Sequence, residues 1–420
     1  MTRSTFTPAE AAELAVVIRG GFVESRHIGS AVVLDPSGSP VLSLGAPAVP
    51  VFTRSSLKPL QAIAAMSLGA RLEGVSAALA SASHKSEAGH VEVVERMLAD
   101  VGLTDSDLRC PSAHPADGSF RRSLQAKGFS GESGLIDPKS RLYFNCSGKH
   151  AAFLAAAVAQ GARTADYLDP AHPVQAKVAE VVETFADETP AAVGIDGCGA
   201  PVFALSLLGL ARAIGRVVRL GSGDGSVADG VNRHGADGVD GSVADDVDPG
   251  TASAPESSSD YTVYTAYAAE ARTLIDAVFA HPWAIEGHGR PNSTVIDRLG
   301  VFAKGGAEGV IVMATKTGYS VALKCLDGSS RATGLVALRL LEKAGAFARS
   351  GAGAEDGAAS ASDPVITEEL LAQVIAAITE PVTGGADSEG RTAVVGRTDL
   401  GEDVSQGSRG RRTDGDSQKN

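Results

Sequence analysis

The spacing of apolar and polar residues predicts a chain that mixes strands with helices. Two apolar runs, 31–34 and 41–44, flank a Pro- and Gly-containing turn at 35–38 and indicate a hairpin. A second strand pair is predicted over 309–314 and 319–324. Apolar residues three and four positions apart predict helices within 1–20 and over 87–101, 151–160, 173–186, 202–214, 264–280, 332–344 and 367–379.

A further apolar-periodic segment begins with a serine and a lysine three residues apart. Ser55 and Lys58 precede Leu60 and Ile63, and Pro59 is tolerated in the first turn of a helix, so we expect Ser55 at a helix N-terminus. One turn of helix then places the hydroxyl and the amine on the same face, as a serine nucleophile and a lysine base require. The pattern S-x-x-K is short, and the same residues are common at the start of surface helices.

Two other stretches carry hydroxyl and amine groups. Ser83 lies just before a predicted helix, where a hydroxyl also serves as an N-cap or turn residue. Lys304 precedes two glycines and a predicted strand, and S-x-x-K hydrolases hold a second amine near the nucleophile in this way. The segment 316–318 copies the K-T-G form of that motif more literally, but Thr-Gly is ordinary in a turn between strands.

The four cysteines are too few and too widely spaced to predict a disulfide framework in a chain of 420 residues. Two of them, Cys146 and Cys198, are closely followed by glycine, and Lys149 comes three residues after the first. Two thiolates and a nitrogen donor can bind zinc, although a lysine amine must first lose its proton. The alternative interpretation is that both are ordinary reduced cysteines, which are commonly small buried apolar residues.

The net charge of −13 argues against nucleic acid and anionic membrane surfaces as partners, because both are bound through basic patches. Much of this charge lies in 221–260, where nine acidic residues accompany one basic residue. No run approaches the 18 apolar residues of a transmembrane helix, and the first residues lack a continuous apolar segment. Together with the unpaired cysteines, these features predict a cytoplasmic protein that does not associate with membranes.

Composition also predicts how the chain is divided. Residues 221–260 are rich in Gly, Asp and Ser, so we expect a disordered insertion between two helices. A Gly/Ala/Ser linker is expected over 350–363, and the polar segment 397–420 is expected to be a disordered tail. The remaining sequence within 1–396 is expected to form a single domain of two lobes.

Several stretches resemble the L-asparaginases of the Rhizobium etli type, the family described as asparaginase II. The resembling blocks follow the family order from residue 20 to residue 307, which makes chance agreement an inadequate explanation. They are 20–27 (G-G-F-V-E-S-R-H), 53–62 (T-R-S-S-L-K-P-L-Q-A), 82–84 (A-S-H), 145–150 (N-C-S-G-K-H), 196–198 (D-G-C) and 303–307 (A-K-G-G-A).

This resemblance implies a fold similar to that of serine β-lactamases and penicillin-binding proteins. In this α/β (α+β) architecture, an antiparallel sheet lobe and a helical lobe hold the nucleophile at a helix N-terminus between them. The implied reaction is hydrolysis of L-asparagine to L-aspartate and ammonia. The implied partners are a small amino-acid substrate and a second copy of the chain in a homodimer.

The resemblance also implies site roles, which are carried over by position. The catalytic set consists of a serine nucleophile with its lysine base and a second Ser–Lys pair that relays protons. One zinc ion per chain is implied as a support for substrate binding rather than as the source of the nucleophile. The implied residues are Ser55, Lys58, Ser83 and Lys304 for catalysis, Arg54 and Asp196 for orienting the substrate or supporting the site, and Cys146, Lys149 and Cys198 for zinc.

The sequence departs from the family pattern at Lys85, at Gly199-Ala200 and in the length of 221–260. Lys85 stands where a small hydroxyl residue is common and adds a cation beside Ser83. These departures bear on substrate affinity more than on the type of reaction. Two alternatives stay open, namely hydrolysis of another amide such as glutamine or a β-lactam on the same fold, and a zinc-binding relative without turnover.

Overall fold

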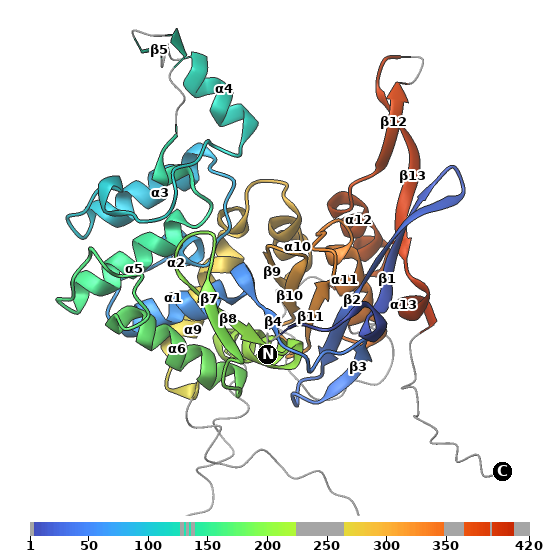
Figure 1. Ribbon diagram of the computed structural model, residues 1–420, viewed down its shortest axis with the longest axis horizontal. Coiled ribbons are helices and arrows are strands. Elements are labelled where there is room, and N and C mark those ends of the chain that lie inside the picture. The colour runs from blue at the N-terminus through green and yellow to red at the C-terminus, as the bar shows by residue number, and fades with distance from the viewer. Residues whose placement is uncertain are drawn as a thin grey trace, which may run out of the picture.

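Strands from both ends of the chain form one antiparallel sheet (Figure 1). The computed structural model describes residues 4–126, 130–131, 134–135, 139–223, 264–347, 365–386 and 389–406. The strands of this sheet are β1 (Ala12–Arg19), β2 (Phe22–Leu34), β3 (Pro40–Leu44), β9 (Phe302–Gly306), β10 (Val310–Ala314), β11 (Ser320–Cys325), β12 (Val382–Ala386) and β13 (Thr392–Leu400). Their order is β12-β13-β1-β2-β11-β10-β9, and β3 pairs with β2 beside this path.

Helices cover the middle of the sheet. The helices beside it are α7 (Leu207–Gly221), α10 (Pro291–Leu299), α11 (Thr333–Lys343), α12 (Glu368–Ile378) and α13 (Glu402–Gln406). Both α7 and α11 contact β10 and β11. Every residue of β10 and β11 is therefore buried, which explains why these strands read as continuous apolar runs rather than as alternating ones.

A second group of helices forms the other half of the molecule, on the left of Figure 1. These helices are α1 (Lys58–Ser67), α2 (Val75–Ala80), α3 (Ala88–Ala99), α4 (Gly118–Ala126), α5 (Ser147–Ala159), α6 (Pro173–Ala186) and α9 (Ala268–Ala280). Short strands β4 (Val51–Phe52), β8 (Pro201–Leu205) and β7 (Ala192–Ile195) form a small sheet, and β5 (Ser130–Gly131) pairs with β6 (Gly134–Leu135). Buried apolar side chains of both halves belong to one continuous core.

The predicted mixture of an antiparallel sheet lobe and a helical lobe is confirmed. The likeness to serine β-lactamases in particular stays a prediction. Both predicted hairpins are present, since β2 pairs with β3 and β10 pairs with β11. No helix in the described ranges is both long and apolar enough to span a membrane.

Two predicted helices were wrong. Within 1–20 only Pro8–Glu10 forms a 3-10 turn, and β1 follows, because the consecutive β-branched residues Val16, Val17 and Ile18 favour a strand. The predicted helix at 202–214 divides into β8 and α7 at Ser206, whose hydroxyl accepts a hydrogen bond from the Gly209 N–H as an N-cap. A fully buried strand and a buried helix cannot be told apart by periodicity alone.

The predicted disordered tail was also wrong over 397–406. Strand β13 pairs with β1 up to Leu400, and Val404 of α13 is buried. The polar residues of β13 had suggested a tail because this strand, second from the edge of the sheet, is only partly buried and carries little apolar signal. The predicted linker at 350–363, residues 224–260 of the predicted insertion and residues 407–420 lie outside the described residues.

Candidate active site

A strained turn places Ser55 between the two halves of the molecule. The chain leaves β4, forms the 3-10 turn Arg54–Leu57 and continues directly into α1 at Lys58. Arg54 has a positive φ of 52°, a left-handed backbone conformation that costs free energy in a residue with a side chain. Thr53 anchors the turn, because its backbone N–H and its hydroxyl both donate to the Phe203 carbonyl, at 3.1 Å and 2.9 Å.

Ser55 therefore lies just ahead of the α-helix rather than in its first turn. In a 3-10 turn, side chains three residues apart lie one above the other, so the predicted shared face for Ser55 and Lys58 is retained. No hydrogen bond joins the two side chains among the described contacts. Ser55 is half-buried and Lys58 is fully buried, and both line one small cavity together with Lys149 and Asp196.

The Lys58 amine is directed toward Ser83. Its Nζ donates to Ser83 Oγ at 3.0 Å, to the Ala82 carbonyl and, at 3.4 Å, to the Asn145 carbonyl. These acceptors come from the segment just after α2 and from the segment before α5, so two separate parts of the helical half fix one buried amine.

Lys304 approaches the same hydroxyl from the sheet. Its Nζ donates to Ser83 Oγ at 2.7 Å and to the Gly305 carbonyl at 2.8 Å. Complete burial, and then the positive charge of Lys58, hold the pKa of Lys304 well below its usual range. Ser83 thus connects two buried amines, one from each half of the molecule.

Arg54 and Asp196 form an ion pair at the same cavity. Arg54 Nε lies 2.8 Å from Asp196 Oδ1, and Glu308 is a more distant partner at 3.9 Å. Burial alone would raise the pKa of Asp196, but the Gly197 backbone N–H, Arg54 and Lys149 together lower it. Asp196 is therefore a carboxylate at neutral pH.

The predicted zinc ligands also lie together. Lys149 Nζ is 3.2 Å from Cys198 Sγ, and Lys149, Cys146 and Cys198 are all buried. A hydrogen bond from Cys198, followed by the charges of Lys58 and Lys149, lowers the pKa of Cys146 well below its usual range. Burial opposes the charge of Lys149, but the two thiols outweigh it and raise the pKa of that amine.

This donor set fits zinc chemically. Two thiols and an amine supply three of the four ligands of a tetrahedral zinc ion. Because Lys149 holds its proton between the thiols, metal binding must release that proton and should weaken as the pH falls.

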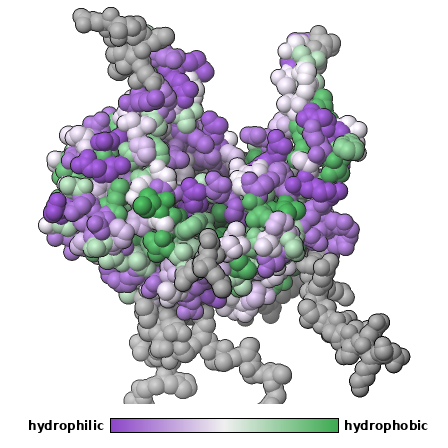
Figure 2. Space-filling view, in the orientation of Figure 1, coloured by the Kyte–Doolittle hydropathy of each residue, from purple (hydrophilic) through white to green (hydrophobic). Residues whose placement is uncertain are grey.

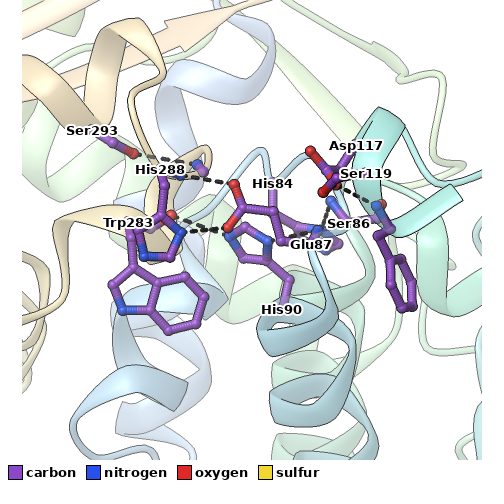
Figure 3. A network of polar contacts seen from close by, with 11 residues as sticks. His84, Ser86, Glu87, His90, Asp117, Ser119, Trp283, His288 and Ser293 are labelled. Atoms are coloured by element: carbon purple, nitrogen blue, oxygen red, sulfur yellow. Dashed lines mark hydrogen bonds and ion pairs between the residues drawn. The ribbon is translucent and has the colours of Figure 1, made fainter. Parts of the chain in front are cut away.

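A polar network beside Ser83 was not predicted as part of the site (Figure 3). The Glu87 carboxylate accepts from the His288 backbone N–H at 2.8 Å and contacts the His288 ring at 2.6 Å, and that ring stacks on Trp283. The Ser83 N–H donates to the Ile285 carbonyl at 2.9 Å. The network therefore fixes the segment that holds Ser83 against the 281–288 loop.

Glu286 is a second residue that the sequence did not single out. Its carboxylate accepts two hydrogen bonds from Asn292, lies 4.0 Å from Lys85 and opposes the lowering of the Lys304 pKa. Lys85, the unusual cation of the sequence, is thus paired with Glu286. The density of polar residues between Glu286 and Asn292 was the available signal. Lys316, the alternative to Lys304, lies instead over the Phe279 ring.

Comparisons with known proteins gave one family match. The model of the family described as L-asparaginase II matches residues 15–242 and 250–377. No curated protein matches the chain. Among solved structures, one described as Mglu in its native form is similar with 11% sequence identity and a TM-score of 0.36. That match covers 75% of this chain and 64% of the Mglu chain, so it spans less than two thirds of the relative.

Proposed function

Because the chain belongs to the L-asparaginase II family, we propose that it hydrolyses the side-chain amide of L-asparagine to L-aspartate and ammonia through a serine nucleophile. Ser55 is the nucleophile and Lys58 its base. Ser83 and Lys304 relay protons. The serine β-lactamase-like arrangement, with the nucleophile at a helix start between two lobes, belongs to the same proposal.

One observation carries this assignment, the hydroxyl of Ser83 held between the amines of Lys58 and Lys304, with Lys58 lining the same cavity as Ser55. A buried lysine whose pKa is lowered can be neutral near pH 7 and can accept a proton. Lys304 can therefore take a proton from Lys58 through the Ser83 hydroxyl, which leaves the Lys58 amine neutral and able to accept the proton of Ser55.

The proposed reaction has two stages, formation of an ester on Ser55 and its hydrolysis. Ser55 Oγ loses its proton to Lys58 and attacks the amide carbon, while backbone N–H groups of the turn that carries Ser55, ahead of α1, stabilise the oxyanion. The C–N bond breaks as the leaving nitrogen receives a proton through Ser83, and ammonia departs. Water then gives its proton to the same base and attacks the ester, which releases L-aspartate and restores Ser55.

The charged ends of the substrate need opposite partners. Arg54 can contact the α-carboxylate and Asp196 the α-ammonium, because both side chains line the cavity beside Ser55. Cys146, Lys149 and Cys198 would hold zinc next to this cavity. When bound, the ion supplies a positive charge that helps to anchor the substrate.

The homodimer is part of the proposal. Apolar residues of the small β4-β8-β7 sheet are unusually exposed, since Ile195 is 83%, Val193 56% and Phe52 44% accessible. Figure 2 shows apolar surface in the region of β7 on the face turned to the viewer. Exposed apolar patches of this kind commonly mark protein–protein contacts, and Asp196 lies directly beside this one.

Ammonia release tests the proposal. Wild-type protein, with and without added zinc, is given L-asparagine or L-glutamine, for which ammonia is measured, or a chromogenic β-lactam, whose hydrolysis releases no ammonia and is followed by its colour change. We expect release from L-asparagine and a loss of roughly 10³-fold or more in Ser55→Ala, by analogy with other serine hydrolases. Ser56→Ala is the matched control, because the Ser56 hydroxyl is buried and donates to the Thr53 carbonyl at 2.6 Å.

Each alternative gives a different result. Faster turnover of L-glutamine or of the β-lactam would show that L-asparagine is not the preferred substrate, but the serine mechanism would stand. Bound zinc without ammonia from either amide would indicate a relative without turnover. Activity retained in Ser55→Ala but lost in Ser56→Ala would identify Ser56, and not Ser55, as the nucleophile.

A further inference from the structure

Three side chains of types that bind metals meet at the end of β11 beside the middle of β2, and none of them lines the cavity at Ser55. His27 lies in β2, Cys325 ends β11, and Asp327 follows in the next turn. Donor atoms of the three side chains all lie within 4.8 Å of one another. His27 belongs to the 20–27 block of the sequence, for which the proposed reaction has no role.

The contacts of this cluster involve the atoms that would bind a metal. His27 Nδ1 lies 2.8 Å from Asp327 Oδ2, and the Cys325 thiol donates to Asp327 Oδ1 at 2.9 Å. The other ring nitrogen of His27 is buried and has no partner within the described ranges, so Nδ1 makes the polar contact of the ring. His27 and Cys325 are buried, whereas the Asp327 side chain is 44% exposed.

The backbone makes this arrangement rigid. Strand β11 pairs with β2 so that Cys325 lies opposite Gly29, and the Leu326 N–H donates to the Ile28 carbonyl at 2.8 Å. Asp327 Oδ1 also accepts from the Ser329 N–H at 2.7 Å, which orients the carboxylate. The three side chains are therefore held by the sheet and its turn rather than by a long loop.

We propose that His27, Cys325 and Asp327 bind one divalent metal ion of the zinc class. Imidazole nitrogen, thiolate and carboxylate are the ligands that zinc accepts, and three protein ligands leave a fourth position for water. The thiolate and the carboxylate balance the charge of the ion, and the thiol proton is released on binding. Because the Asp327 side chain is partly exposed, a metal ion can reach the three ligands from solvent.

The neighbouring cation does not compete for this site. Lys324 Nζ donates to the carbonyls of Glu308 and Cys325, at 2.5 Å and 2.7 Å, and is held there by both. A bound ion would join β2 to the turn after β11. This inference is independent of the proposed reaction.

Counting bound cobalt tests the proposal. Full-length protein is freed of metal with a chelator, titrated with Co²⁺ and followed by bound equivalents and by the thiolate-to-cobalt absorption. We expect wild type to bind one equivalent more than His27→Gln, Cys325→Ser or Asp327→Asn. Asp327→Asn changes an exposed turn residue and keeps the test valid if Cys325→Ser does not fold.

Cys110→Ser is the matched control. Cys110 is also a buried thiol, and it donates to the Arg141 carbonyl at 3.6 Å away from this cluster. It should keep the wild-type count. Because the test is a difference between wild type and the variants at His27, Cys325 and Asp327, cobalt at Cys146 and Cys198 adds equally to those counts and cannot imitate the result. Equal counts in wild type, His27→Gln and Asp327→Asn would overturn the proposal.

Discussion

Lys304 is a residue whose burial opposes stability and whose lowered pKa suits the proposed chemistry. Its amine is completely buried, and its hydrogen bonds go to Ser83 and Gly305. Burial lowers its pKa, so between that pKa and about 10.4 the folded state binds fewer protons here than the unfolded chain does. The contribution of Lys304 to the free energy of unfolding therefore decreases as the pH falls through this window.

Replacing this residue should reverse that dependence. We expect Lys304→Met to gain stability relative to wild type as the pH falls from about 10 toward 7, by up to about 1.4 kcal/mol per pH unit. Asparagine turnover should be lost. Urea unfolding at several pH values measures the difference, with Lys177→Met at the surface of α6 as the control. A difference that is constant with pH would contradict the lowered pKa.

At the level of elements, β9 and the turn at 54–57 must approach closely for the site to form. A Cβ added to Gly306 would lie 3.0 Å from the Thr53 carbonyl oxygen and 3.4 Å from the Ser55 nitrogen. Both atoms belong to the backbone and cannot move without shifting the turn. Glycine at this position therefore allows the sheet to support the Ser55 turn directly.

Gly306→Ala should consequently damage activity more than stability. We expect kcat to fall about 10²-fold through displacement of Ser55, with about 1–3 kcal/mol of lost stability. Gly305→Ala is the control on the same strand, because the atoms nearest to its added Cβ belong to the side chain of Asn292, at 3.3 Å or more, and not to the backbone of the turn. Steady-state ammonia release and thermal unfolding of both variants measure the effect. Equal losses in the two variants would mean that the strand, not the turn, is disturbed.

The elements that could be predicted from the sequence are those with a local signal. The β2–β3 hairpin has its turn residues, and α6 was predicted with its observed bounds, from Pro173 to Ala186. Strands β1 and β8 were not predicted, because a helix start signal at Thr7 and an apolar run at 202–205 favoured helices there. Their pairing partners lie far away in the sequence, and periodicity within a window cannot show such partners.

The candidate site shows the same limit. Ser55 and Lys58 are visible as a motif, but the amine of Lys58 contacts Ser83 and Asn145 rather than Ser55. The bridge from Ser83 to Lys304 joins residues more than 200 positions apart, so the family resemblance could imply this pair but the spacing of residues along the chain could not. Glu87 was missed for the same reason, because its partner His288 comes from a distant loop.

For the whole molecule, the C-terminal segment completes the sheet. Strand β13 pairs with β1 from Ala15–Leu400 to Arg19–Gly396, and α13 contacts β1 through a segment that includes buried Val404. Lys343 of α11 donates to the Ser405 carbonyl at 2.8 Å. The first and last described strands are therefore neighbours, which makes the two ends of the chain dependent on each other.

Truncation tests this dependence. We expect a chain that ends at Gly396 to lose roughly 3 kcal/mol or more of unfolding free energy, because it loses strand pairing and buried apolar surface. A chain that ends at Gln406 keeps every described contact of the segment and should match the full-length protein. Urea unfolding compares the two. Equal stability of both truncated chains would contradict this dependence and would support the disordered tail that was predicted from the composition.

The central claim is that Ser55 attacks the substrate while Lys58, Ser83 and Lys304 move its proton. A diazo-ketone analogue of L-asparagine alkylates an attacking side chain, and peptide mass spectrometry identifies the modified residue. We predict a single modification at Ser55 that rises in step with the loss of ammonia release. Modification of Ser83, Ser56 or Cys146 with Ser55 intact would contradict this account.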